Sequence, residues 1–523
     1  MFKCYYADII GLIISYWIVM EYLNTKVVVR SILIVGLLIL VMMSTLGEKV
    51  AYNNGVGWDG QWYFAVCQDF LHNIFNHTYD TYRIQRILPF AIINIVLTIL
   101  GIEPTIANCT LCISAMNFCM IALGVFMFIK ISDQLKLKLP IEIIGFSALF
   151  LNYPILKLNG YYPFLTDTFA ISIAICLLYF FLSQKKVPIT LIIIGGFVWP
   201  TLLMMGLVLA HMPSKAMIQS APMTKKDKQE LRLIKCLLMA FIPLGYLIFW
   251  VALFYIKHIN IQKTYNGEPF ANLYMLAISL ICIVLYFGYM LKTIQFSPRQ
   301  QIKAFITLLE RNNLIAFTLT VLCTHMFINY LSNGKSLVSI WQMIALRLIV
   351  PPTTDPLVFI VTSFMYYGPC MLFLLFYWKG VLNVVYTFGY SYFMLVILGL
   401  IMSVNTESRH MITFVPMLMI PLLKYMNESL SEKINLSQSL SFLTCSLLIS
   451  RFWYKINVPG IESAFAQNVL TQFPAQRYFM SHGPWMSHTM YLVFLLVTVA
   501  TSVFFLLSHK YFAIKNIHSA LFG

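Results

Sequence analysis

Long runs of apolar residues, separated by short clusters of lysine and arginine, recur from one end of the chain to the other. Of the 523 residues, 60% are hydrophobic and only 10% are charged, and the mean hydropathy is +0.80. A soluble domain of this size could not bury so much apolar surface, whereas a transmembrane helix requires a run of about 20 predominantly apolar residues. The sequence therefore predicts an all-α, polytopic bundle of transmembrane helices, with about 12–15 spans.

The basic clusters predict how these spans are oriented. The net charge of +16 comes largely from residues between the apolar runs, as in loops that face anionic cytoplasmic lipid, so it does not indicate nucleic-acid binding. When Lys185, Lys186 and the basic segment 215–235 are assigned to the cytoplasm, the spans alternate and both chain ends lie inside. The expected spans are 31–46, 107–129, 141–154, 168–182, 187–211 (two short helices broken at Pro200), 236–256, 273–291, 314–331, 357–377, 381–402, 411–423, 439–450 and 491–507.

Two apolar runs near the N-terminus do not fit this series directly. Residues 9–20 are bracketed by acidic residues, and they are either a short first span or an extension upstream of a start at Met20. Residues 87–100 would reach only roughly 21 Å as a helix, less than the roughly 30 Å hydrocarbon core. We expect residues 87–100 to lie on the outer surface, because the lysines within 130–138 then face the cytoplasm.

The spans and loops divide the chain into five segments. The N-terminal segment and first span are residues 1–46, and the first outer loop with its surface helix is 47–104. A helical module follows at 105–211, and a basic cytoplasmic loop at 212–235. The C-terminal helices occupy 236–523, with outer loops at 333–356 and 451–488. An amphipathic portion at 341–350 is expected to lie on the membrane. The sequence contains no Walker loop, HExxH or zinc-ligand pattern and no soluble domain large enough to bind a nucleotide, which disfavours ATP-driven pumping.

The informative polar residues gather in the segments expected outside, most clearly at 57–63, which read Gly-Trp-Asp-Gly-Gln-Trp-Tyr. The glycines permit tight turns, and the aromatic rings offer stacking faces for a sugar and anchors at the interface. The Asp59 carboxylate would be partly desolvated near the bilayer surface and could then act as a general base. The alternative is that Asp59 and Gly60 form an ordinary Asp-Gly turn. The candidate substrate-binding aromatic residues are Trp58, Trp62 and Tyr63.

Two arginines in the first outer loop are candidate phosphate contacts. Arg83 and Arg86 precede the expected surface helix, and arginine binds phosphate bidentately. The alternative is that both contact lipid headgroups at the interface.

Charged residues also lie at the outer ends of two later spans. Asp167 would contact a metal ion or the acceptor, or would act together with Asp59. The alternative is that Asp167 only stabilises the start of its helix, where a negative charge is favourable. Glu407, Arg409 and His410 suggest an anion site with Arg409 as the phosphate contact. The alternative for that group is an internal salt bridge that caps the helix.

These features together resemble the GT-C superfamily, polytopic glycosyltransferases that take sugars from polyprenyl-phosphate donors. The resemblance is carried by the Trp-Asp-Gly-Gln-Trp-Tyr stretch after the first span, the arginines before a short outer helix, a second acid at an outer helix end and a broken helix pair. The stretch is similar to that of the phosphatidylinositol-glycan mannosyltransferase II branch and of uncharacterised bacterial membrane proteins of the DGQFY type. The resemblance covers residues 1–210, and beyond them only the topology and a late outer arginine agree.

The resemblance implies a role for each of four residues. Asp59 would be the base that deprotonates the acceptor hydroxyl, and Arg409, together with Arg86, would bind the donor phosphate. Asp167 would position the acceptor or a divalent cation, with Asp59 as the other candidate metal ligand. The first outer loop lacks the Asp-x-Asp or Glu-x-Asp pair of some relatives, so the resemblance does not establish a metal.

Two other functions stay open on the sequence. A transporter or flippase for a lipid-linked glycan would need charged residues deep in several spans. A polysaccharide polymerase or ligase would need several arginines in a large late outer loop, and Arg451 and Arg477 lie in such a loop here. For the transferase, the expected partners are a polyprenyl-phosphate sugar, a glycan, lipid or protein acceptor, and membrane lipids. The composition suggests a bacterial plasma membrane with the site facing outside, in the cell envelope, and an endoplasmic reticulum location would give the same topology.

Overall fold

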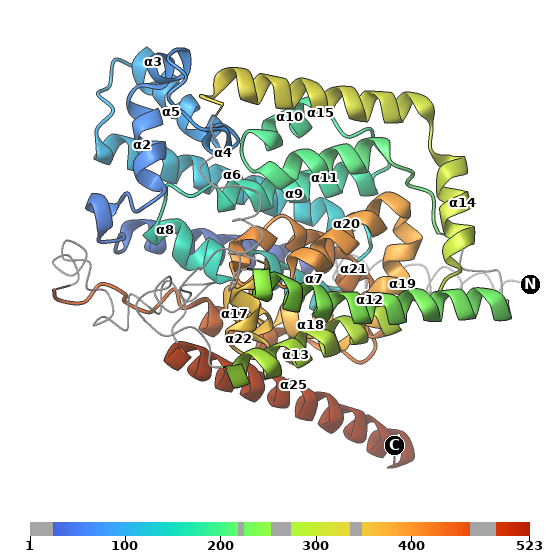
Figure 1. The fold of residues 1–523 in the computed structure, drawn as a ribbon. Coiled ribbons are helices and arrows are strands. Elements are labelled where there is room, and N and C mark those ends of the chain that lie inside the picture. Colours follow the sequence, from blue (N-terminus) through green and yellow to red (C-terminus); the bar gives the residue numbers. More distant parts are fainter. Residues whose placement is uncertain (1–24, 218–223, 253–272, 335–347, 461–487, 523) are drawn as a thin grey trace, which may run out of the picture.

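The computed structural model describes residues 25–217, 224–252, 273–334, 348–460 and 488–522. All regular elements within these ranges are helices (Figure 1), which confirms the predicted all-α class. The segment 47–104, expected from the sequence as the first outer loop and called so below, contains η1 (Tyr52–Gly55), α2 (Gly60–Gln68), α3 (Phe70–Phe75), α4 (Thr81–Ile84) and α5 (Leu88–Ile99). The helices that follow are α6 (Ile106–Gln134), α7 (Leu139–Phe150), η2 (Pro154–Leu158), α8 (Asn159–Tyr161), α9 (Asp167–Leu182), α10 (Ile189–Gly196), α11 (Pro200–His211), α12 (Lys225–Val251), α13 (Leu273–Lys292), α14 (Pro298–Leu308) and α15 (Arg311–Leu331). The last third contains η6 (Pro351–Thr353), α17 (Val358–Tyr367), α18 (Cys370–Phe376), α19 (Trp378–Phe388), α20 (Tyr390–Met402), η7 (Ser408–Met411), α21 (Phe414–Ser429), α22 (Leu436–Ser450) and α25 (His488–Phe522).

Six helices among the described residues are long and apolar enough to cross a membrane, or up to eight if each bent pair is one span. The six are Thr25–Leu46, Ile106–Gln134, Lys225–Val251, Met275–Lys292, Arg311–Leu331 and His488–Leu507. Several other expected spans are apolar helices of 10–17 residues, which reach roughly 15–26 Å and fall short of the hydrocarbon core when straight. The chain is therefore an integral multi-pass protein with fewer full-length helices than the apolar runs predicted.

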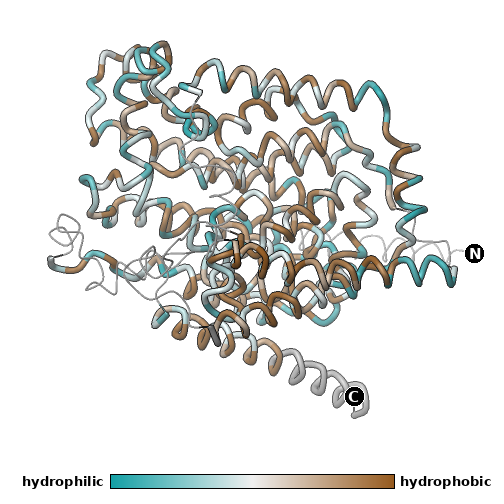
Figure 2. The backbone as a smooth tube through the Cα atoms, in the orientation of Figure 1, coloured by the Kyte–Doolittle hydropathy of each residue, from teal (hydrophilic) through white to brown (hydrophobic). Residues whose placement is uncertain are grey.

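The centre of the bundle is built from α7, α9 and α21, which are buried along most of their length. Figure 1 shows these helices between α15 on one side and α25 on the other. The outer helices expose apolar side chains instead, including Leu285 (65% exposed), Met326 (69%) and Leu496 (70%). Figure 2 shows hydrophobic residues along most helices and hydrophilic residues mainly in the first outer loop, α14 and the start of α12. Apolar side chains on the outer face are what a lipid environment requires.

Two expected spans in the last third are each broken into two helices. The segment 357–377 forms α17 and α18, separated at Gly368, and 381–402 forms parts of α19 and α20, separated at Gly389. Both glycines have positive φ, of 85° and 101°, a conformation in which glycine is favoured and at which helices end. α18 and α19 meet at an angle of 87°. The sequence predicted one span in each segment and did not predict these breaks, because hydropathy does not register them.

The basic segment 212–235 is not a loop throughout. Its second part begins α12 at Lys225, where the Thr224 and Asp227 side chains form a reciprocal capping box with the backbone. The Thr-x-x-Asp pattern is visible in the sequence and outweighs the local clustering of lysines. The break at Pro200 between α10 and α11 and the short helix α5 agree with expectation. The expected amphipathic portion at 341–350 and most of the 451–488 loop lie outside the described residues, as does the segment 9–20.

A buried ion-pair network ties the first span to α6 and α7. Glu142 is 3% exposed and accepts from Arg30 Nε at 2.5 Å, and Lys26 Nζ lies 3.0 Å from its other oxygen. Asp133 of α6 also pairs with Arg30, and Ser132 donates a hydrogen bond to Glu142 at 2.6 Å. Three helices are therefore joined through one carboxylate.

Replacing Glu142 with glutamine is expected to lower the free energy of unfolding by about 3–5 kcal/mol, because it leaves buried cations without their carboxylate. Thermal unfolding of the purified chain in detergent measures this effect. Glu432→Gln is the matched control, because Glu432 pairs with Lys138 at an exposed position where such a pair contributes about 0–1 kcal/mol. Equal melting temperatures for the two variants would contradict a structural role for the buried network.

A second anchor joins the first outer loop to the start of the last one. Glu48 accepts hydrogen bonds from Lys157 Nζ at 2.8 Å and from the backbone N–H groups of Ile456 and Asn457 at 2.7 and 2.9 Å. Asn457 in turn donates to the carbonyl of Lys49. These contacts fix the beginning of the first outer loop, whose later residues carry Asp59.

Candidate functional site

Asp59 lies in a tight turn directly before α2. Gly57 has a φ of +78°, and a Cβ there would collide with the Tyr162 ring, so this position requires glycine. The Tyr162 hydroxyl accepts a hydrogen bond from the Gly60 N–H at 3.0 Å, and burial raises the pKa of this hydroxyl so that it stays protonated. Asp59 precedes α2 but its side chain makes no capping bond. The carboxylate, which is 48% exposed, is therefore available to other groups.

Arg409 lies between two carboxylates. It belongs to η7 and is 7% exposed, and its guanidinium donates to Asp167 Oδ2 at 3.0 Å. The other terminal nitrogen, Nη1, lies 3.7 Å from Asp59 Oδ2. The neighbouring residue Ser408 is fixed through its carbonyl, which accepts from the Tyr367 hydroxyl at 2.6 Å. The two acids expected to be partners are thus brought together by an arginine between them.

Asp167 is buried at the beginning of α9. Its side chain is 4% exposed, and its two oxygens accept from Arg409 and, at 3.3 Å, from the Tyr366 hydroxyl. The first turn of a helix favours a negative charge. Because both oxygens are occupied by protein donors, Asp167 is arranged to hold Arg409 in position.

Arg86 is a second buried arginine beside this pair. It is 2% exposed, and its guanidinium carbon lies 4.0 Å from the Trp199 ring centroid and 4.6 Å from that of Tyr82. The guanidinium of Arg409 lies 5.7 Å from the same Trp199 ring. Within the ranges that the structure describes, no carboxylate pairs with Arg86, and its Nε has no hydrogen-bond partner. A buried cation in this state is costly unless an anion binds it.

Arg83 is engaged by other residues of the same segment. Its guanidinium forms an ion pair with Asp80 at 3.1 Å and stacks on the Trp62 ring at 3.7 Å. Asp80 also caps α4 by accepting from two backbone N–H groups. Arg83 and Trp62 therefore form a local pair on the first outer loop, at its partly exposed surface.

The other predicted aromatic residues support the turn that holds Asp59. Trp58 stacks on Tyr52, with ring centroids 5.1 Å apart, and Tyr63 is 2% exposed and stacks on Phe90 at 4.5 Å. Tyr63 cannot present a free face to a sugar from this position. Its role as a stacking platform was expected from the sequence and does not fit its burial.

Glu407 and His410 lie close to the arginine pair. His410 is 7% exposed, its Nδ1 lies 3.1 Å from the Asn405 amide and 3.7 Å from the Glu407 carboxylate, and its ring centroid is 6.3 Å from that of Trp199. Arg409 pairs with Asp167 from another helix, so the group is not a purely local salt bridge. Both residues therefore support the segment that carries Arg409.

The described residues contain no group of three or more histidine, cysteine, aspartate or glutamate side chains arranged to hold a metal ion. The two acids considered as metal ligands, Asp59 and Asp167, both face the Arg409 guanidinium. This donor set does not fit a divalent cation.

Two residues at the site were not among the sequence candidates. Trp199 directly precedes Pro200, at the break in the expected span 187–211, and Tyr366 lies within an apolar run like those of the other expected spans. A tryptophan directly before a helix-breaking proline is a weak signal for a side chain turned into the bundle. No local pattern distinguishes Tyr366 from the other tyrosines.

The comparisons with known proteins give no match: no protein-family model, no curated protein and no solved structure is similar enough to this chain to assign it.

Proposed function

We propose that this chain is a membrane glycosyltransferase that moves a sugar from a polyprenyl-phosphate donor to an acceptor at the membrane surface. Its resemblance to the GT-C superfamily in residues 1–210 motivates the class of donor. The observation that carries the proposal is the pair of buried arginines, Arg409 and Arg86, which both lie near the Trp199 ring and next to a half-exposed carboxylate. This pairing supports binding of an anionic leaving group beside a base.

The leaving group would be bound by the two arginines. A departing polyprenyl phosphate develops negative charge on its oxygens, and fixed cations in a partly buried site stabilise that charge strongly. Arg86 has no paired acid in the described part of the chain, and Arg409 has a firm bond to Asp167 and a longer contact to Asp59. The phosphate would displace the longer contact and leave the Asp167 bond intact.

The displaced Asp59 would act as the base. The acceptor hydroxyl oxygen bonds to the anomeric carbon of the sugar while the bond between that carbon and the phosphate oxygen breaks. The hydroxyl proton goes to the Asp59 carboxylate, and the electron pair of the broken bond leaves with polyprenyl phosphate. At 3.7 Å the contact between Asp59 and Arg409 is longer than a hydrogen bond, so the carboxylate keeps its lone pairs for the proton.

The test is sugar transfer by the purified full chain in liposomes. A panel of polyprenyl-phosphate sugars is offered with glycan, lipid and protein acceptors, and nucleotide sugars with the same sugars serve as control donors. We expect polyprenyl phosphate to be released from at least one lipid donor and no transfer from the nucleotide sugars. Transfer from nucleotide sugars, or passage of an uncleaved lipid-linked glycan across the bilayer, would contradict the proposal.

Replacing Arg86 with methionine is expected to weaken donor binding without destabilising the chain. The variant removes a buried cation that has no paired acid in the described residues, so it leaves no buried carboxylate without its partner. Binding of polyprenyl phosphate and thermal unfolding without ligand measure the two effects.

The Arg83→Met variant is the control for Arg86, because Arg83 already pairs with Asp80. Polyprenyl phosphate should raise the melting temperature of the wild type and of Arg83→Met more than that of Arg86→Met. A lower melting temperature for Arg86→Met without ligand, together with unchanged donor binding, would make Arg86 a structural residue.

A further inference from the structure

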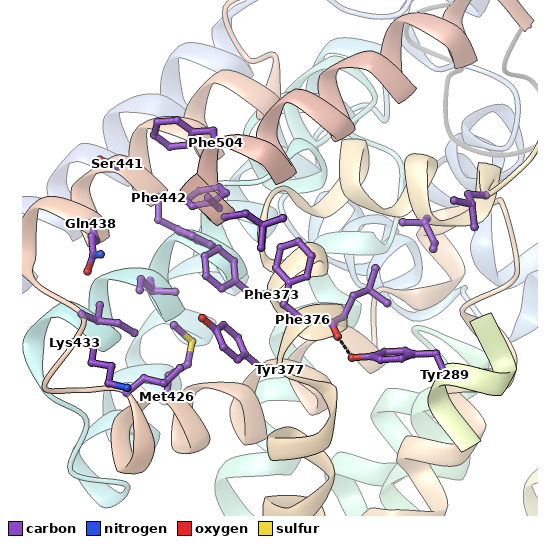
Figure 3. Close-up of a pocket in the computed structure, with 18 of the residues that line it drawn as sticks. Tyr289, Phe373, Phe376, Tyr377, Met426, Lys433, Gln438, Ser441, Phe442 and Phe504 are labelled. Atoms are coloured by element: carbon purple, nitrogen blue, oxygen red, sulfur yellow. Dashed lines mark hydrogen bonds between the residues drawn. The ribbon is translucent and has the colours of Figure 1, made fainter. Parts of the chain in front are cut away.

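A large apolar cavity lies apart from the candidate site. It has a volume of about 760 Å³ and lies between α13, α18, α22 and α25, near the end of α21 (Figure 3). None of Asp59, Arg86, Asp167 and Arg409 lines it. Binding sites for small ligands have volumes of about 300–1,000 Å³, so this cavity is large enough for a bound molecule.

The cavity opens on the apolar outer surface of the bundle. Its lining includes Leu285 of α13 and Leu506 of α25, which are 65% and 54% exposed. Both helices are long and apolar enough to cross a membrane, so the opening faces hydrocarbon. Phenylalanine rings, including those of Phe373 and Phe442, line the interior. An occupant that enters from the membrane and fills an aromatic cavity must itself carry hydrocarbon.

A group of polar lining residues lies at one end, whereas the hydroxyls of Tyr286 and Tyr289, elsewhere in the lining, are hydrogen-bonded to Ser403 and to the Leu375 carbonyl. Lys433, Ser437, Gln438 and Ser441 come from the turn before α22 and its first turns. Figure 3 shows the Lys433 ammonium and the Gln438 amide on the same side of the cavity, with the Tyr377 hydroxyl directed toward that side. The first turn of a helix also favours a negative charge. An occupant with an anionic end would therefore have a preferred orientation.

Lys433 is the cation available to such an occupant. It forms no ion pair within the part of the chain that the structure describes, whereas acids nearby are engaged: Glu428 pairs with Lys424, and Glu432 pairs with Lys138. Basic pockets between transmembrane helices bind anionic lipid headgroups. The cavity thus combines a hydrocarbon-binding interior with a single available positive charge at one end.

We propose that this cavity binds an anionic phospholipid. An acyl chain of the lipid lies in the aromatic interior, and its phosphate contacts Lys433. This site goes beyond the proposed sugar transfer and does not depend on it. Its ligand is a membrane lipid held between helices that pack around the central bundle.

Native mass spectrometry of the full chain, delipidated in detergent, tests this site with dioleoyl phosphatidylglycerol and dioleoyl phosphatidylcholine as probes. We expect the wild type to bind phosphatidylglycerol more tightly than phosphatidylcholine. Lys433→Gln should weaken phosphatidylglycerol binding about fivefold, the effect of one lysine near a lipid surface, and Lys433→Arg should retain it. Lys424→Gln is the matched control, because Lys424 lies on the same end of α21 but is paired and does not line the cavity.

A second variant tests the cavity itself. Ser441 lines the cavity at an exposed position of α22, so Ser441→Trp should fill the opening without disturbing the core, and it should weaken binding of both lipids. Inorganic phosphate should not displace phosphatidylglycerol, because the interior contributes most of the binding free energy. Any one of four results would overturn the proposal: equal binding of the two lipids, equal effects of Lys433→Gln and Lys424→Gln, unchanged binding by Ser441→Trp, or displacement by inorganic phosphate. Displacement by polyprenyl phosphate would also overturn it and would assign the cavity to the donor.

Discussion

Replacing Asp59 with asparagine is expected to lower sugar transfer by about 100- to 10,000-fold, the usual contribution of a positioned base. Asparagine keeps the size of the side chain and cannot take the acceptor proton. The Asp59 side chain is 48% exposed and its contact with Arg409 is 3.7 Å long, so the free energy of unfolding should change by no more than about 1 kcal/mol. The measurement is the initial rate of transfer from the donor found in the panel, together with thermal unfolding.

Asp69→Asn is the control for this variant. Asp69 is an exposed acid at the end of α2 and the next acid along the chain after Asp59. The control should transfer sugar at the wild-type rate. Donor binding should survive in Asp59→Asn, since both arginines are intact. Equal turnover by Asp59→Asn and the wild type would show that Asp59 is not the base, even if the chain is a transferase.

Changing Arg409 is expected to have the second large effect, on both stability and transfer. Arg409→Gln leaves the Asp167 carboxylate buried without its cation, which should lower the free energy of unfolding by about 3–5 kcal/mol. In the proposed reaction it also removes a cation that would bind the leaving phosphate, and transfer should fall by about 100- to 1,000-fold. Arg409→Lys keeps the charge but cannot contact Asp167 and a phosphate with separate nitrogens, so it should recover stability more than transfer.

A double variant separates the two effects of Arg409. Asp167→Asn combined with Arg409→Gln removes both members of the buried ion pair and should recover part of the stability lost in Arg409→Gln. Transfer should stay low in the double variant, because the cation for the phosphate is still missing. Recovery of transfer along with stability would show that Arg409 acts only in folding, and unchanged stability in all three variants would contradict the buried pair.

The sequence alone determined the class of the fold and several of its local features. Apolar runs of this length are stable only as helices in a membrane, and the structure forms helices in those runs, although several are short or broken. Pro200 ends one helix and begins the next because it lacks an N–H, which acts within a single turn. The capping box at Thr224 and Asp227 is equally local, although the lysines around it favoured a loop.

The tertiary structure decided how the candidate residues meet. Asp167 and Arg409 were each visible at the end of a span, but 242 residues separate them, and no local pattern specifies that they share a hydrogen bond. The same holds for Trp199, whose ring lies near Arg86 and Arg409 only because three distant segments pack together. The burial of Tyr63 was likewise settled by packing. Helix formation and capping depend on neighbours within a few residues, whereas the pairing of buried charges depends on which helices pack side by side, and only the folded bundle specifies that.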